Sequence, residues 1–125
     1  MKYRRGDIVV VNLGENIGSE QSGIRPCLIL SNDKANEVSP TVQIAPLTSR
    51  TKNALPVHIK AGTECGLKCQ STVLLEQIRV IDTSRILGFV GHKTLTFLDN
   101  IKIFIEFGCA NLVDNDKVAI ARKEY

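Results

Sequence analysis

The sequence contains no tryptophan, and aromatic residues make up only 5% of its 125 residues. A broad platform on which several bases stack needs aromatic side chains, so this scarcity argues against an RNA-recognition sheet. The net charge is also small, +3 with histidine neutral. Such a surplus is too weak to hold a protein on duplex DNA by charge alone. Any nucleic-acid site must therefore be local and built from a few side chains.

Long apolar stretches are missing as well, because no run reaches the ~18 residues of a membrane span. The N-terminal segment is charged, and only four apolar residues stand between Asp7 and Asn12, unlike a secretory signal. We therefore expect a cytoplasmic protein without membrane contact. The length fits a single domain, which we place at residues 1–112, followed by a tail at 113–125.

The four cysteines do not follow a metal-binding pattern. Cys65 and Cys69 are separated by three residues without a second such pair, and neither His58 nor His92 completes a zinc-finger spacing. Cys27 falls in an apolar run, where cysteine usually behaves as a small buried hydrophobe. We predict reduced structural thiols, and neither a metal nor another cofactor.

Short apolar runs separated by polar turns recur along the first 90 residues. The runs that indicate strands are 8–11, 26–30, 41–46, 57–59, 71–75, 78–81 and 86–90. A helical turn at 34–38 is preceded by Asn32 and Asp33 as candidate caps, and a capping-box pattern at 96–99 begins a longer helix that extends to about 111. Many short strands predict a compact antiparallel barrel, so the expected fold is mainly β with a C-terminal α-helix.

A glycine-containing polar loop that ends at Arg25 is the most informative segment. Gly18 and Gly23 allow backbone angles that other residues avoid, and Pro26 biases Arg25 towards extended geometry. A guanidinium stays charged and carries five donors in a flat fork that suits phosphate oxygens. The loop therefore indicates a phosphate-bearing ligand, with a surface ion pair to a carboxylate as the structural alternative.

Polar residues interrupt the apolar strands at three places, and the cost of burying polar groups suggests that these places share one site. With their flanking residues they contribute to five ordered motifs, which are RRGD at 4–7, GSEQ at 18–21, GIRP at 23–26, PLTS at 46–49 and LEQIRVID at 75–82. In this order and spacing, the motifs resemble the MazF/PemK family of toxin endoribonucleases from residue 4 to about 112.

The resemblance implies an SH3-like barrel of the type shared by MazF, PemK and CcdB, forming a homodimer that cleaves single-stranded RNA at a short sequence. It also implies a cognate antitoxin whose disordered acidic C-terminal segment blocks the RNA groove. By motif position, Arg25 and Thr48 match the family's catalytic pair. The positions that match RNA-contacting residues are Ser19, Glu20, Gln21, Ser49 and Gln77.

Some family members use a different set of catalytic groups. They combine a histidine in the loop with an arginine and a carboxylate near the fifth strand, but here those positions are Ser19, Leu74 and Glu76. Glu76 is therefore retained as an assisting group, and Arg25 with Thr48 is the better candidate pair.

The chemistry of RNA cleavage also favours Arg25 and Thr48 as the catalytic pair. RNA cleavage without a metal proceeds most simply when the substrate's own 2′-hydroxyl attacks the adjacent phosphorus, which leaves a cyclic phosphate and a 5′-hydroxyl. Arg25 and Thr48 would stabilise the added negative charge, with Glu20, His58 and His92 as alternative proton acceptors. Two other functions stay open: a non-catalytic toxin on the same barrel that binds a protein such as DNA gyrase, and a plain RNA-binding module.

Overall fold

The computed structural model describes residues 3–18, 20–50 and 58–106. The strands are β1 (Asp7–Asn12), β2 (Ile24–Ile29), β3 (Thr41–Thr48), β4 (Ile59–Ala61), β5 (Ser71–Val73), β6 (Arg79–Asp82) and β7 (Ile86–His92). The short helices are α1 (Asp33–Val38) and three 3₁₀ turns, η1 (Thr63–Cys65), η2 (Leu75–Gln77) and η3 (Thr83–Arg85). A last helix begins at 97, and its described part reaches 106. None of the helices in these ranges combines the length and apolarity that crossing a bilayer requires.

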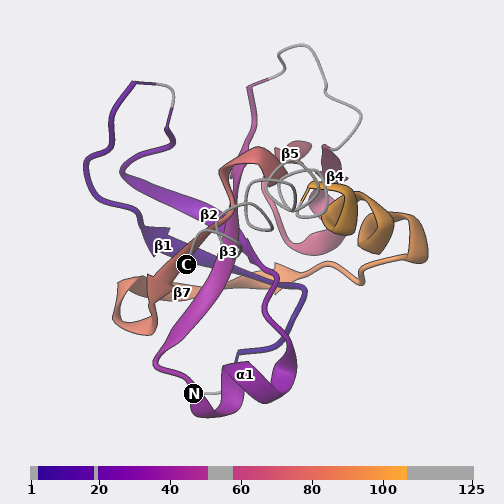
Figure 1. Ribbon diagram of the computed structural model, residues 1–125. Coiled ribbons are helices and arrows are strands. Elements are labelled where there is room, and N and C mark those ends of the chain that lie inside the picture. The colour runs from indigo at the N-terminus through magenta and orange to yellow at the C-terminus, as the bar shows by residue number, and fades with distance from the viewer. Residues whose placement is uncertain (1–2, 19, 51–57, 107–125) are drawn as a thin grey trace, which may run out of the picture.

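The strands form one antiparallel sheet that curls into a half-barrel (Figure 1). Neighbouring strands follow the order β4-β5-β3-β2-β1-β7, and β6 also pairs with β3. β3 is the central element, because its first half pairs with β6 and its middle with β2, while its last two residues pair with β5. The end of β3 therefore lies where the two parts of the curled sheet meet.

Local signals in the sequence placed most elements correctly. Asn32 caps α1, and its side chain accepts a 2.8 Å hydrogen bond from the Ala35 amide. The capping box at the last helix also forms as predicted. The Thr96 amide donates to the Asp99 carboxylate and the Asp99 amide donates to the Thr96 hydroxyl oxygen, both at 3.1 Å. The predicted end of this helix near 111 lies outside the described residues.

Each predicted strand differs from the observed one by one or two residues at one end or both, and two of these differences bear on the site. β3 continues two residues past Pro46 and ends at Thr48, because Pro46 pairs with Cys27 and its carbonyl accepts a bond from the Leu74 amide. The fourth strand, predicted at 57–59, covers Ile59–Ala61 instead, and residue 57 lies outside the described residues.

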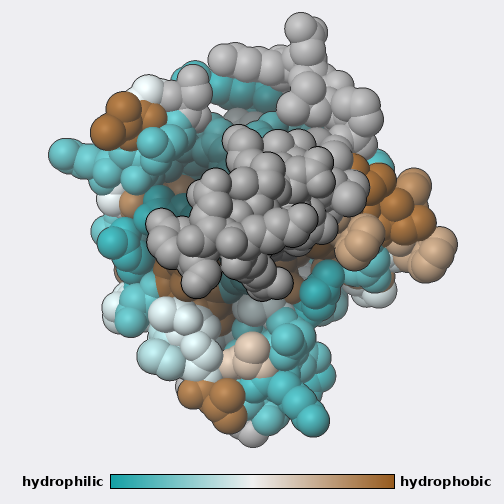
Figure 2. All heavy atoms as spheres, viewed as in Figure 1, coloured by the Kyte–Doolittle hydropathy of each residue, from teal (hydrophilic) through white to brown (hydrophobic). Residues whose placement is uncertain are grey.

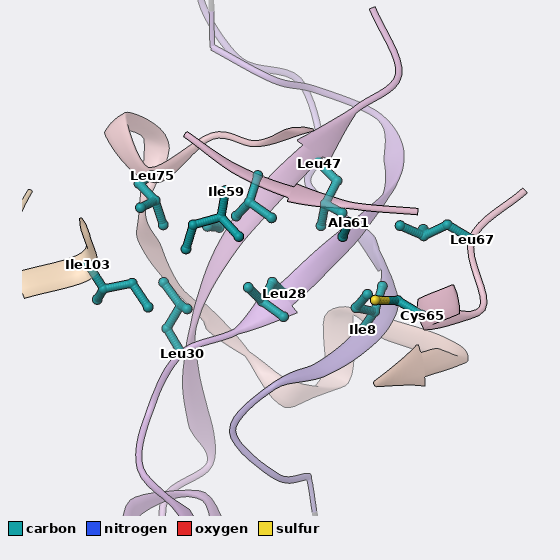
Figure 3. Packing of buried hydrophobic residues seen from close by; sticks show 12 residues of the cluster. Ile8, Leu28, Leu30, Leu47, Ile59, Ala61, Cys65, Leu67, Leu75 and Ile103 are labelled. Carbon is teal, nitrogen blue, oxygen red and sulfur yellow. The ribbon is translucent and has the colours of Figure 1, made fainter. Parts of the chain in front are cut away.

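Alternate residues of the central strands build two separate hydrophobic clusters, since successive side chains of a strand point to opposite faces. The first cluster contains Ile8, Leu28 and Leu47, and Ile103 of the last helix completes it (Figure 3). The second contains Val9, Cys27 and other residues of the opposite face. The last helix therefore covers one face of the sheet, and the strand ends that carry the polar motifs are held by both clusters.

Candidate functional site

The loop between β1 and β2 is closed at its base as a continuation of the strand pair. Leu13 donates its amide to the Gly23 carbonyl, and Gly23 donates to Gly14, both at 2.8 Å. Gly18 and Gly23 have φ of 60° and 75°, the left-handed conformation that the sequence led us to expect. This closure fixes the entry into β2 just before Arg25.

Arg25 is the second residue of β2 and is half-buried. Its Nε donates a 2.9 Å hydrogen bond to the Ser22 carbonyl, which anchors the guanidinium on the loop. None of the ion pairs found in the described part of the chain involves Arg25, so the structural alternative of a carboxylate partner is not observed there. An anchored Nε leaves the two terminal nitrogens to contact a ligand.

Thr48 occupies the position on β3 that corresponds to Arg25 on β2. The β2–β3 pairing ends at Cys27 with Pro46, and Arg25 and Thr48 each lie two residues beyond that pair. Residues at equal distances from an antiparallel pair share one face of the sheet. The Thr48 hydroxyl oxygen accepts the Arg50 amide at 3.2 Å, so its hydrogen can still be donated to a phosphate oxygen.

Two cavities flank the end of β3. We call the first the Arg25 cavity; its volume is about 330 Å³, and Arg25 and Ser49 line it. We call the second the Gln77 cavity; its volume is about 310 Å³, and the predicted residues Glu20, Gln21, Glu76 and Gln77 line it. Pro46 borders the second cavity and Leu47 the first, whereas Thr48 itself lines neither of the two. Ser19 lies outside the described residues.

The Gln77 cavity is held together by bonds from the loop to the segment before β6. The side-chain oxygen of Gln77 accepts the Gln21 amide at 2.8 Å. Asn16 donates to the carbonyls of Leu13 and Gln21 and accepts from Arg79 Nη1 at 3.4 Å. Sequence analysis missed Asn16 and Arg79 as site residues, although Arg79 is part of the fifth motif.

Replacing Gln77 by leucine tests this attachment. The substitution leaves the Gln21 amide without its acceptor, and an unsatisfied buried donor costs about 1–3 kcal/mol. We expect amide hydrogen exchange at Gln21 to accelerate while exchange at Gly23, which bonds to Gly14, stays protected. Unchanged protection of the Gln21 amide in the folded variant would contradict the attachment.

Glu76 is engaged by a histidine. His58 Nε2 and Glu76 Oε2 lie 2.7 Å apart, and the two side chains are 9% and 33% exposed. His92 instead contacts Asp7 at 2.8 Å. Asp7 is the strand partner of His92, and it lies four residues before Val11, the β1 partner of Arg25. At about 3.3 Å per residue, His92 is therefore roughly 13 Å along the strands from Arg25. In the described residues, no group of three or more histidine, cysteine or acidic side chains is arranged as a metal site.

Cys27 lies beneath two positive charges on the second face of the sheet. Burial raises the pKa of the Cys27 thiol from 9.0 to about 12, and Arg79 and Arg25 partly oppose this rise. Both arginines therefore act on the same buried thiol. Arg79 pairs with Ile44, a member of the same hydrophobic cluster as Cys27, which places its side chain on this face too.

Thiol labelling checks the burial of Cys27. The folded state retains the thiol proton that the unfolded chain loses near pH 9, so this thiol's contribution to stability is complete below pH 9 and is lost as the pH rises towards 12. We expect iodoacetamide at pH 8 to modify exposed Cys69 in the native protein and Cys27 only after unfolding in urea. Peptide mass spectrometry measures both sites; native labelling of Cys27 at the rate of Cys69 would contradict the burial.

The comparison with known families decides what kind of protein carries this site. A model described as "PemK-like, MazF-like toxin of type II toxin-antitoxin system" matches residues 4–106. The chain belongs to this toxin family. All five motifs lie within the match, whereas the predicted domain end at 112 lies beyond it and stays a prediction.

Individual relatives of this MazF-like toxin agree with the family match. Endoribonuclease EndoA of Bacillus subtilis is 35% identical over 116 residues, which are 91% of this chain and 99% of EndoA. Endoribonuclease MazF of Staphylococcus saprophyticus is 40% identical over 102 residues, 80% of this chain and 81% of that protein.

Solved structures confirm the predicted fold class. Deinococcus radiodurans MazF is 27% identical and superposes with a TM-score of 0.72, covering 86% of this chain and 98% of that one. In its MazE–MazF crystal the TM-score is 0.66 at 26% identity, covering 86% of this chain and 97% of that one. The half-barrel with its C-terminal helix is therefore the MazF fold.

Proposed function

We propose that this MazF-like toxin is a metal-independent, sequence-selective endoribonuclease that cleaves single-stranded RNA. The observation that carries the proposal is the placement of Arg25 and Thr48 beyond the same strand pair, on one face. Arg25 has no carboxylate partner in the described part of the chain. The names of the two relatives above, both endoribonucleases, support the same activity here.

In the proposed reaction, the 2′-oxygen of the RNA forms a bond to the adjacent phosphorus and the bond from phosphorus to the 5′-oxygen breaks. The products are a 2′,3′-cyclic phosphate and a 5′-hydroxyl, and DNA is not cleaved because it lacks the nucleophile. Arg25 and Thr48 donate hydrogen bonds to the non-bridging oxygens as their negative charge grows.

Two protons must move in this reaction. Glu20 and Glu76 both line the Gln77 cavity, but the carboxylate of Glu76 is held by His58. We therefore assign the acceptance of the 2′-hydroxyl proton to Glu20, with Glu76 as an assisting group that borders the same cavity. Water returns a proton to the departing 5′-oxygen.

The remaining predicted residues contact the RNA on either side of the cleaved bond. Gln21 and Gln77 line one cavity and Ser49 the other, and Ser19 belongs to the same loop by sequence. The side-chain oxygen of Gln21 is buried without a hydrogen-bond partner among the described residues. An amino group of a bound base would satisfy this acceptor, which supports a role for the loop in base recognition.

The partners follow from the family. Toxins of type II systems act with an antitoxin, and an acidic antitoxin segment would pair with Arg25 and Arg79. A second copy of the chain would cover β7, which ends the strand order and exposes Leu87 and Phe89 at 58% and 61%. Cellular RNA as the substrate places the protein in the cytoplasm.

Purified full-length protein incubated with a long RNA in EDTA tests the activity. We expect discrete cuts by primer extension, 5′-hydroxyl ends that a polynucleotide kinase can label, and loss of both in Thr48→Val. Thr72→Val is the matched control, because Thr72 is the strand partner of Thr48. RNA binding without cuts would favour the binding module, and cuts that survive in Thr48→Val would contradict the assigned role.

A further inference from the structure

The Arg25 cavity has more apolar surroundings than phosphate binding requires. Apolar side chains from five segments form its walls: Val10, Pro26, Leu47, Leu67 and Val90. Its polar side chains are Arg25, Ser49, Lys68, Cys69 and Ser71. Apolar walls with a few polar groups are the usual composition of small-molecule pockets, and about 330 Å³ is near the lower end of their size range.

We propose that this cavity receives one unstacked base of the RNA beside the cleaved phosphate and sets the base preference at that position. The inference rests on the proposed nuclease function and adds a specificity pocket to it. It assigns a recognition role to Lys68 and Ser71, two residues outside the five motifs.

The fit of a base follows from its shape and its point of attachment. A nucleobase has two flat apolar faces and a polar edge, and proteins that read single-stranded RNA hold such bases splayed out of the stack. Arg25 both binds the phosphate and lines the cavity, so the base on an adjoining ribose starts next to the opening. Within ranges 3–18, 20–50 and 58–106, no aromatic side chain lines this cavity, so aliphatic walls contact the base faces.

The polar edge of the base would meet one donor and one acceptor. Lys68 carries only donors on its ammonium group. Ser71 is 7% exposed, and its hydroxyl donates to the Cys69 carbonyl at 3.2 Å, so its oxygen offers lone pairs to a ligand. This pair cannot satisfy the edges of all four bases equally well, and the preference should therefore depend on Lys68.

Cys69 supplies a way to fill the cavity without altering the catalytic pair. It is exposed and lines the cavity, whereas Cys27 and Cys65 are buried. The fourth cysteine of the sequence, Cys109, lies outside the described residues and is replaced by serine. In this Cys109→Ser background, N-ethylmaleimide at neutral pH should modify Cys69 alone among the described cysteines. A randomised RNA pool, cleaved before and after labelling, is then sequenced from its 5′-hydroxyl ends.

We expect labelled protein to keep cutting but to lose base preference at one position next to the cleaved bond. The rate on the preferred sequence should fall about tenfold, in the range that one lost pocket contact costs. As a control, Thr63→Cys with Cys69→Ser places the label on the exposed turn η1, away from the cavity lining. Labelling this control should change neither the preference nor the rate.

Lysine substitutions give an independent measurement. Lys68→Met keeps the length of the side chain and removes its donors, so it should alter the preference at the same position. Lys60→Met is the matched control, because Lys60 is exposed on β4 and does not line the cavity.

The outcomes separate the two levels of the proposal. If unmodified protein does not cut, or if it cuts without Arg25, the nuclease proposal fails. If unmodified protein cuts and needs Arg25, but both the labelled protein and Lys68→Met retain the original preference at every position, the specificity pocket alone is overturned.

Discussion

Arg25→Ala is expected to lower the rate constant of RNA cleavage by about 10²–10³-fold, the usual effect of removing one preorganised donor to a developing oxyanion. The loss should be large because the loop closure and the bond to Ser22 hold the guanidinium in place before substrate arrives. Single-turnover cleavage of a labelled RNA oligonucleotide measures the chemical step separately from product release.

Two further variants define the role of the guanidinium. Arg25→Lys keeps the charge but loses the flat fork of donors, so only part of the activity should return. Arg4→Ala removes an exposed arginine near the opposite end of β1 and should leave the rate close to that of the wild type. If Arg25→Ala cleaves as fast as Arg4→Ala while both are folded, the proposed reaction is wrong.

Features encoded by neighbouring residues could be predicted from the sequence. The Asn32 cap and the Thr96–Asp99 capping box depend on side chains three residues from the amides that they bind. The left-handed glycines of the loop were likewise predictable, because few other residues adopt that conformation. Arg25 and Thr48 were predicted as a pair from motif order, and the strand register explains why the two distant motifs share one end of the sheet.

Contacts between distant segments could not be predicted in this way. Asn16 and Arg79 are 63 residues apart in the sequence, and His58 and Glu76 are 18 apart. The residues of each pair come into contact only in the curled sheet, so no pattern of neighbouring residues in the sequence predicts the contact. The end of β3 was missed for a related reason. Proline usually marks a strand end, but the Pro46 carbonyl accepts a hydrogen bond from the distant Leu74 amide, and the strand continues past the proline.

Leu47→Ala is expected to reduce the free energy of unfolding by about 2–5 kcal/mol, the range observed when a buried leucine is truncated. Leu47 is 1% exposed and belongs to the core cluster shown in Figure 3. Leu98→Ala removes the same atoms from a side chain of the last helix that is 58% exposed, and it should change stability by no more than about 0.5 kcal/mol. Urea unfolding at one fixed protein concentration compares the two.

The same substitution distinguishes packing from chemistry at the site. Figure 2 shows apolar surface over the last helix, whereas Leu47 is enclosed between the sheet and the Arg25 cavity and directly precedes Thr48. Where Leu47→Ala is still folded, its enlarged cavity should relax base preference more than it slows cleavage, because Arg25 and Thr48 remain. A stability loss no greater than that of Leu98→Ala would show that the end of β3 is not held by this core.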